Sequence, residues 1–328
     1  MTKSTRPEHQ LDNRRSGFAE SHRPRPARPR ALGLGLLMNI VRDVPMLPII
    51  VVVSIVLSFT IDGFLSVGNL QNIMRQLSVI LIAVTGQTLV LLIGGIDLSM
   101  GATIGLASVC GAFMMHSTDS SLLGLLACLA TGSAIGALNG FGVARGGLQP
   151  FIMTFSMMLT VRAVAFLLTG GFSVGKLPKA LLQTGRMNIA GLPLVFVLGL
   201  AVALFVAFVL SRTVFGEKIY LTGSNPRAAA FSGIDVRRLK FQVYLIAGAA
   251  AGAAAFVFMM RLGAATPTAG DQLLLQIIGS VVLGGTSLNG GEGGIIRSCS
   301  GAVLVALLCS EEKPPSPFWR RRLLFEVG

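Results

Sequence analysis

The sequence predicts an all-α fold, a polytopic bundle of transmembrane helices with about eight or nine spans. Of its 328 residues, 52% are hydrophobic and only 12% are charged, and the mean hydropathy is +0.74. Soluble domains carry about a quarter of their residues as charges. The apolar residues also fall in blocks of about twenty, the length at which a helix crosses a hydrocarbon core of about 30 Å. A soluble globular domain is therefore excluded.

The apolar blocks define one membrane domain, residues 44–309, between two polar ends. The predicted spans are 44–61, 77–94, 99–115, 121–143, 150–169, 192–210, 241–260 and 272–288. A further block, 298–309, would form about 18 Å of helix at 1.5 Å per residue, which is short of the membrane core.

The N-terminal arm, residues 1–43, is rich in arginine and proline. Such a segment cannot bury a core, so we expect it to be disordered. It lies directly before the first apolar block, where positive charge holds a segment in the cytoplasm. We therefore assign the formal net charge of +13 to topology and contact with membrane lipid. Nucleic-acid binding is not expected, because it needs a folded basic surface.

Counting spans from a cytoplasmic N-terminus predicts the side on which each loop lies. Six crossings return the loop 211–240 to the cytoplasm, and its many basic residues fit the positive-inside rule. These residues are Arg212, Lys218, Arg227, Arg237, Arg238 and Lys240. The loop 170–191 is then expected outside, although Lys176, Lys179 and Arg186 oppose that placement. A short surface helix is predicted there, from about Lys179 to Thr184.

Glycines recur at four-residue spacing within the spans. The spacing occurs at Gly132, Gly136 and Gly140, at Gly101 and Gly105, and at Gly248 and Gly252. Small residues in this pattern let membrane helices approach closely. We interpret them as helix-packing positions.

Three segments carry more specific signals. The first, GQTLVLLIGGIDLSMG, runs from Gly86 to Gly101. Its paired glycines break the helix, and Asp97 or Ser99 can cap the next one. An ionisable residue beside a broken membrane helix predicts a functional site. A capped turn without further function explains it equally well.

The second segment, NGFGVARGGLQPFIMTFSMMLTVRAVAFLLTGG, runs from Asn139 to Gly171 and places Arg162 inside a span. A lone arginine at that depth is costly unless it faces a partner or water. Arg162 could neutralise Asp97, bind backbone carbonyls or contact a transported molecule. We favour structural pairing.

The third segment, FGEKIYLTGSNPRAAAFSGIDVRRLK, covers Phe215 to Lys240 in the cytoplasmic loop. Pro226 can begin a short helix and Gly233 can end it. A small-faced helix flanked by arginines suits docking into a groove on a cytosolic protein. A plain solvated loop would explain the charges but not these start and stop signals.

Together with VVLGGTSLNGGEG, Val281 to Gly293, these segments resemble the ribose-type permeases of ATP-binding-cassette importers in order and spacing. The resemblance runs from about Leu47 to Gly301. The GGIDLS segment favours this group over the related branched-chain amino-acid permeases, which generally lack it.

The resemblance implies a multi-pass subunit of the bacterial inner membrane that works as a dimer with a second permease copy. Its implied partners are cytoplasmic ATP-binding-cassette ATPases and a periplasmic sugar-binding protein. It further implies that the third segment is the coupling helix, which docks the ATPase. The predicted docking residues are Asn225, Ala228, Ala229, Gly233 and Ile234, with the adjacent Arg227.

Two places depart from the family. This chain has Leu274 and Gln276 where the family usually carries an acidic pair. After Ala306 the family continues through hydrophobic helices, whereas this chain continues CSEEKPPSPFWRRRLLFEVG. We therefore expect an aberrant tail, 310–328, produced by truncation or a frameshift. About one and a half of about ten spans would be missing, which could leave a degenerate, inactive permease.

The predicted function is a permease subunit for a monosaccharide or related polyol, without an enzymatic activity, cofactor or metal of its own. Paired carboxylates, histidine clusters and nucleophile–base spacings do not occur in the sequence. A polyol needs hydrogen-bonding groups in an otherwise apolar wall. The predicted path residues are Gln87, Asp97, Asn139 and Arg162. The alternative is an ion-coupled secondary transporter, which usually needs intramembrane carboxylates, for which Asp97 is the best candidate.

Overall fold

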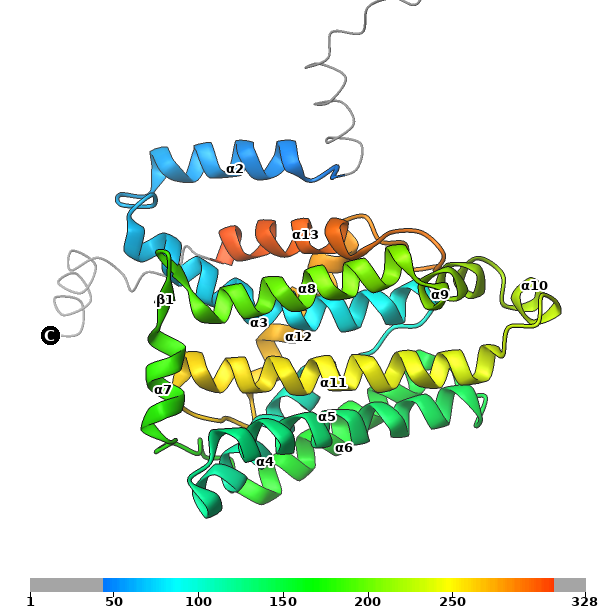
Figure 1. Cartoon of the computed structure of the whole chain (residues 1–328), viewed down its shortest axis with the longest axis horizontal. Coiled ribbons are helices and arrows are strands. Elements are labelled where there is room, and N and C mark those ends of the chain that lie inside the picture. Colours follow the sequence, from blue (N-terminus) through cyan, green and yellow to red (C-terminus); the bar gives the residue numbers. More distant parts are fainter. Residues whose placement is uncertain (1–43, 310–328) are drawn as a thin grey trace, which may run out of the picture. The chain divides into compact units, whose positions relative to one another are not determined.

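The computed structural model describes residues 44–309, which form a bundle of helices (Figure 1). The predicted basic arm, 1–43, and the predicted aberrant tail, 310–328, lie outside the described residues. The helices are α2 (Leu47–Thr60), α3 (Val67–Leu92), α4 (Met100–Thr118), α5 (Ser121–Ala144), α6 (Pro150–Thr169), α7 (Lys179–Arg186), α8 (Leu194–Arg212), α9 (Val214–Ser224), α10 (Pro226–Phe231), α11 (Val236–Leu262), α12 (Ala269–Leu283) and α13 (Ile295–Leu308). The strands β1 (Asn188–Ile189) and β2 (Leu192–Pro193) form a small antiparallel pair.

Within the described residues, six helices are long and apolar enough to cross a membrane: α3, α4, α5, α6, α8 and α11. The helices α2, α12 and α13 are apolar but have only 14 or 15 residues, which is about 21–22 Å of helix. The all-α polytopic fold is therefore confirmed. The expectation of eight to nine spans stays a prediction. The surface helix predicted near Lys179 is also confirmed, as α7.

Two spans begin earlier than the hydropathy predicts. Helix α3 starts at Val67 and not at residue 77. Its N-cap Ser66 accepts a hydrogen bond from the N–H of Asn69 at 3.4 Å. Helix α11 starts at Val236, where the Asp235 carboxylate accepts one at 3.0 Å. Side-chain oxygens at these positions satisfy N–H groups that have no partner within the helix. The first turns of both helices carry polar residues, so a search for apolar residues does not find them although they are helical.

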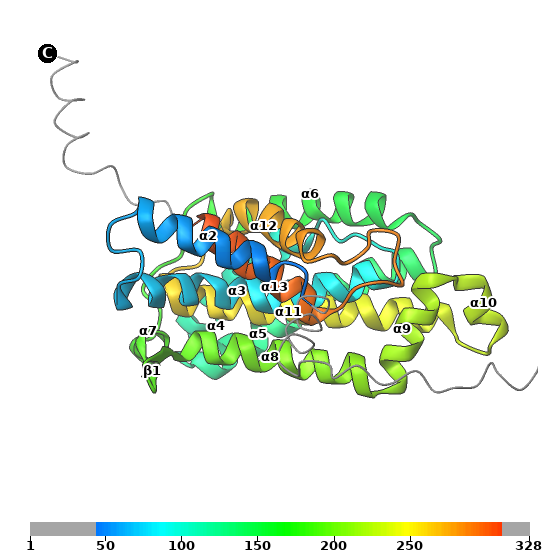
Figure 2. The ribbon, with the colours of Figure 1, turned by 90° about the horizontal axis from the view of Figure 1, so that it is seen from above.

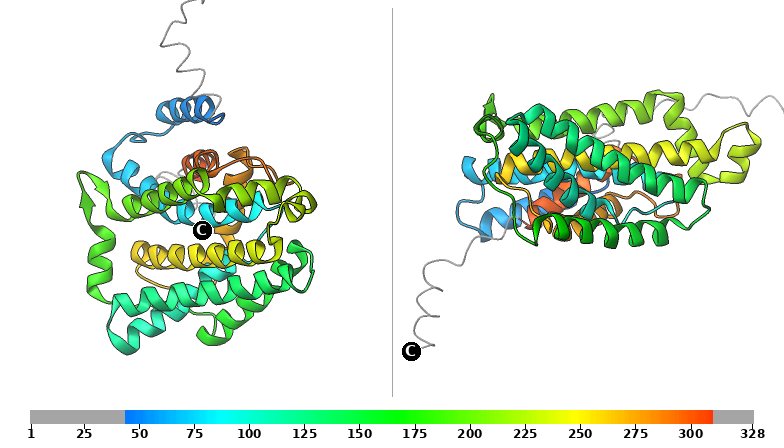
Figure 3. Two further views of the ribbon diagram at one scale, coloured as in Figure 1. Left: turned by 45° about the vertical axis from the view of Figure 1, so that its right-hand side comes forward. Right: turned by 90° about the horizontal axis from the view of Figure 1, so that it is seen from below.

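Helix α3 is the most enclosed element of the bundle. All its residues from Leu77 to Leu92 are buried, and it contacts α8, α11, α12 and α13. Helices α6 and α8 instead expose large apolar side chains, such as Leu167 and Phe205, as expected for surfaces that face lipid. The long helices run side by side (Figure 2). Helix α11 (yellow) lies between the α4–α5 layer and the α3–α8 layer (Figure 3).

Helix α11 packs against α5 through glycines, with the two backbones in direct contact. A Cβ atom at Gly132 would collide with the carbonyl oxygen of Gly248, and one at Gly136 would collide with that of Tyr244. A Cβ at Gly140 would lie 3.0 Å from the carbonyl oxygen of Phe241. Any larger side chain at these positions would force the helices apart.

The connection from α11 into α12 approaches α4 in the same way. A Cβ at Gly101 would collide with the carbonyl oxygen of Gly270, and one at Gly105 would lie 2.8 Å from that of Pro267. These contacts fix where α12 begins, beside α4.

The side chain of Arg162 on α6 forms an ion pair with Asp271 in the first turn of α12. The Nη2–Oδ2 distance is 3.0 Å, and the two side chains are 47% and 41% exposed. The guanidinium also lies 5.8 Å from the ring centroid of Phe166. The alternative in which Arg162 neutralises Asp97 is therefore wrong, because α12 supplies a nearer carboxylate.

We predict that Gly136→Ala destabilises the bundle by about 1–3 kcal/mol, the usual cost of overpacking. Gly279→Ala on α12 is the matched control, since a Cβ there meets no atom within 4 Å. It should leave stability unchanged or raise it by up to about 1 kcal/mol through helix propensity. Unfolding free energies in detergent measure both. Equal behaviour of the two variants would contradict the interlocked α5–α11 contact.

We also predict that Arg162→Asp and Asp271→Arg each lower stability, whereas the double exchange restores most of the loss. The expected coupling energy is about 0.5–3 kcal/mol for residues in direct contact. A double-mutant cycle of unfolding free energies measures it, and additive losses would show that the pair contributes nothing.

Candidate functional site

A polar cavity of about 1160 Å³ lies where α3 begins and α11 ends. Its walls come from α3, α11, α12, α13 and the connection before α12. The carboxamides that line it are Asn69, Asn72, Gln76, Gln272 and Gln276. Two threonines, one arginine and one aspartate join them: Thr266, Thr268, Arg261 and Asp271. Apolar side chains, among them Phe258 and Leu262, complete the lining.

The cavity offers mainly uncharged hydrogen-bonding groups. A carboxamide both donates and accepts, and so does a hydroxyl. The hydroxyl oxygens of Thr266 and Thr268 lie 3.1 Å apart. These groups match the hydroxyls of a sugar or polyol, which also donate and accept.

One acceptor in the wall has no partner among the described residues. Gln276 donates from Nε2 to Sγ of Cys309 at 3.4 Å, while its Oε1 is buried without a hydrogen bond. Leaving a buried polar atom unpaired costs about 1–3 kcal/mol, so such an atom calls for an explanation. An acceptor on the cavity wall is suited to a hydroxyl donor from a bound molecule.

None of the cavity residues is among the predicted path residues, although Gln276 is one of the two positions that depart from the family. The lining comes from four helices distant in sequence, so no local motif contains it. One signal was available. Asn69, Asn72 and Gln76 follow a spacing of three and four residues, which places them on one face of a helix.

Three of the predicted path residues, Gln87, Asp97 and Asn139, lie together at a site outside the polar cavity. Oδ1 of Asp97 accepts hydrogen bonds from the backbone N–H of Ser99 at 2.8 Å and from its hydroxyl at 2.6 Å. Asn139 donates to the Ser99 hydroxyl oxygen at 2.8 Å. With its carboxamide turned to satisfy both contacts, Gln87 donates to the Asp97 carbonyl at 3.1 Å and accepts from its N–H at 3.3 Å.

This network joins the broken end of α3 to α4 and α5. Gly94 has a φ of +75° at the break, and Asp97, not Ser99, supplies the side-chain oxygen that caps the start of α4. Thr154 of α6 accepts from the Leu98 N–H at 3.1 Å. The three path candidates are fully enclosed and do not line the polar cavity. Their role in a path stays a prediction.

The predicted docking helix is α10, which lies at one end of the bundle (Figure 1). Oδ1 of Asn225 accepts from the N–H groups of Arg227 at 3.1 Å and Ala228 at 3.0 Å. Pro226 occupies the first turn, and Gly233 with φ of +83° follows the helix end. The helix therefore starts and stops where the sequence signals predict.

The faces of α10 differ sharply in exposure. Ala229 is buried, and its carbonyl accepts from the Ile234 N–H at 3.1 Å, which closes the C-terminal end of the helix. Arg227 and Ala228 are exposed. Phe231, which sequence analysis did not include, is 94% exposed. The exposed part of α10 therefore carries one large apolar side chain beside Arg227, and its docking role stays a prediction.

The glycine-rich segment 281–293 meets α3 and α9. The Gly291 N–H donates to the Leu92 carbonyl at 2.9 Å, and the Tyr220 hydroxyl donates to the Gly293 carbonyl at 3.0 Å. A Cβ at Gly223 would collide with the Leu92 carbonyl oxygen. This contact connects the end of α9, next to α10, with the break after α3.

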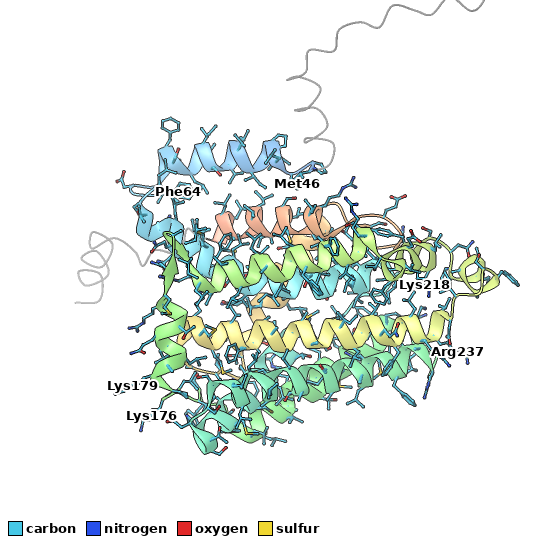
Figure 4. All side chains as sticks on the ribbon, viewed as in Figure 1. Met46, Phe64, Lys176, Lys179, Lys218 and Arg237 are labelled. Carbon is cyan, nitrogen blue, oxygen red and sulfur yellow. The ribbon has the colours of Figure 1, made fainter. Side chains whose placement is uncertain are left out.

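The docking helix and the polar cavity lie at opposite ends of α11. Its 27 residues extend about 40 Å, from Val236 just after α10 to Leu262 in the cavity wall. Figure 4 shows Lys218 and Arg237 at the α10 end and Lys176 and Lys179 at the other. The bundle therefore carries the exposed helix α10 at one end and the polar cavity at the other.

Several known permease proteins are similar to this chain over most of its length. The ribose import permease protein RbsC of Escherichia coli (strain K12) is 38% identical over 268 residues, 80% of this chain and 83% of that protein. The D-allose transport system permease protein AlsC of the same strain is 33% identical, covering 79% of each chain. The fructose import permease protein FrcC of Rhizobium meliloti is 33% identical, covering 79% of this chain and 76% of its own. No solved structure matches significantly.

A family model described as "Branched-chain amino acid transport system / permease component" matches residues 69–310. This range includes the cavity, the buried network and α10. The chain therefore belongs to this family of transport-system permeases and is a multi-pass membrane permease.

Proposed function

We propose that the chain is the permease subunit of an ATP-driven, binding-protein-dependent importer of a monosaccharide or related polyol. The observation that carries the proposal is a cavity walled by carboxamides at the end of the bundle opposite a capped, exposed helix. The names of its relatives refer to ribose, allose and fructose, which are neutral polyhydroxylated molecules. Their common chemistry fits the uncharged donors and acceptors in the wall.

The cavity end faces the periplasm in this proposal, and α10 faces the cytoplasm. The basic residues around α10 favour this orientation. A binding protein delivers the sugar to the cavity, where the amides of α3 and α12 exchange hydrogen bonds with its hydroxyls. Phe258 and Leu262 offer apolar surface to the ring carbons. Each such hydrogen bond contributes only about 0.5–1.5 kcal/mol net, so the sugar is held weakly enough to move on.

The driving step acts on α10. Two cytoplasmic ATPases, one under each of two permease copies, would close on ATP and carry their docked α10 helices with them. Helix α11 follows α10 directly and is held to α5 by backbone contact. A displacement of α10 would therefore shift both helices as one body and change which side of the path is open. The chain contributes a path and a lever, and the hydrolysis belongs to the ATPases.

We predict that Phe231→Ala lowers the affinity for the ATPase subunit by about 30-fold, or about 2 kcal/mol, the effect of removing an aromatic residue at the centre of an interface. Phe172→Ala is the matched control, because Phe172 is also highly exposed (79%) but lies after α6, away from α10. Co-purification and binding measurements with the purified ATPase test this. Equal binding by both variants would contradict docking through α10.

We further predict that Gln276→Leu raises the half-saturating concentration for sugar uptake by about three- to tenfold, through loss of one hydrogen bond to the sugar. Folding should suffer little, since the lost oxygen has no partner among the described residues and the lost Nε2–H donates only to Sγ of Cys309, at 3.4 Å. Uptake into vesicles under saturating binding protein measures the effect. Gln149→Leu at the opposite end of the bundle is the control and should leave uptake unchanged.

The energy source separates this function from an ion-coupled transporter. Uptake by the assembled system should stop on ATP depletion and continue when the proton gradient is collapsed. The reverse pattern would refute an ATP-driven importer.

A further inference from the structure

A second pocket, of about 750 Å³, lies near the α10 end of the bundle, where α5 ends and α11 begins. Its basic wall comes from Arg145, Arg237 and Arg238, and its apolar wall from Phe141, Phe241 and Leu245. It belongs neither to the polar cavity nor to α10. Its combination of charge and apolar surface has no role in the transport steps described above.

The pocket carries an excess of positive charge. Its single carboxylate, Asp235, pairs with Arg238, with Nε and Oδ2 2.9 Å apart. In the part of the chain that the structure describes, no carboxylate lies within 4.0 Å of the guanidinium nitrogens of Arg145 or Arg237. The guanidinium carbon of Arg145 lies 5.7 Å from the ring centroid of Phe141, a cation–π distance. Two arginines are thus available to an anion.

The position of these arginines selects the kind of anion. Arg145 directly follows the 24-residue span α5, so it lies at the membrane surface. One turn back along α5 Phe141 is 54% exposed, and two turns back Leu138 is 56% exposed. The basic rim therefore adjoins an apolar helix face that is open to the hydrocarbon. A molecule that can contact both the arginines and the apolar helix face has a phosphate at the membrane surface and an acyl chain in the hydrocarbon core.

We propose that this pocket binds the headgroup of an anionic phospholipid. Arg145 and Arg237 hold the phosphate, and an acyl chain lies along Phe141 and Leu138. Basic pockets between transmembrane helices on the cytoplasmic side suit anionic headgroups, and arginine binds phosphate oxygens with paired N–H groups. The bound lipid would bridge α5 and α11 at the end of α11 that follows α10.

The test is lipid binding to the purified full-length permease without its ATPase, followed by native mass spectrometry during titration with phosphatidylglycerol. Arg145→Gln and Arg237→Gln should each weaken binding about fivefold, which corresponds to about 1 kcal/mol for one basic residue beside an anionic surface. Arg212→Gln is the control, because Arg212 is an exposed arginine that ends α8 outside the pocket. Arg212→Gln should bind phosphatidylglycerol as tightly as the unmodified protein does.

Further arms separate the possible ligands. Phosphatidylcholine should bind more weakly than phosphatidylglycerol and should not respond to the two substitutions. Arg145→Lys, which keeps the charge, should bind more tightly than Arg145→Gln, so a defect shared by both would indicate lost packing and overturn the proposal. Saturation by glycerol phosphate at the same concentration as the lipid would show a free-anion site. If the glutamine variants bind lipid unchanged but bind the ATPase more weakly, the arginines form a protein contact. This outcome and the glycerol phosphate outcome would each overturn the lipid site.

Discussion

Contact between the backbones of α5 and α11 is the constraint on which the rest of the bundle depends. In lipid, apolar helices gain nothing by hiding from solvent, so close van der Waals contact must hold them together. Gly132 and Gly136 remove the side chains that would prevent that contact. The pairing fixes the register of α11 from Phe241 to Gly252. Because α11 begins beside the docking helix and ends in the cavity wall, the position of both features follows from this one interface.

The buried network around Asp97 plays a corresponding part at the break between α3 and α4. A broken helix leaves backbone groups without partners inside the protein, and Asp97, Ser99 and Gln87 supply partners for several of them. Asn139 extends the network to the helix that α11 packs against. The GGIDLS segment is thus held in place by polar contacts at the depth where glycine contacts hold α5 to α11.

Local signals in the sequence predicted much of this fold, and long-range contacts account for what they missed. Helix α10 was predictable because Asn225, Pro226 and Gly233 act on their immediate neighbours. The partner of Arg162 was not, because Asp271 reaches it only after α12 has packed against α4. The polar first turns of α3 are instructive. Asn69 and Asn72 hid the start of that helix from a hydropathy search, and the same two side chains line the cavity. The polar side chains that lowered the hydropathy at the start of α3 are thus among those that line the cavity.

On the proposed function, the carboxamide wall that includes Gln276 has a consequence for the rate at which sugars pass and for which sugars are chosen. A wall in which neutral amides outnumber the charged side chains Arg261 and Asp271 exchanges one hydrogen-bond partner for another at little cost. Residence in such a wall is brief, and sugars that differ only in the configuration of one carbon would be treated almost alike. On the proposed function, discrimination must then precede entry. Exchange of the delivering protein, without any change in this chain, would be enough to redirect the importer to a new sugar.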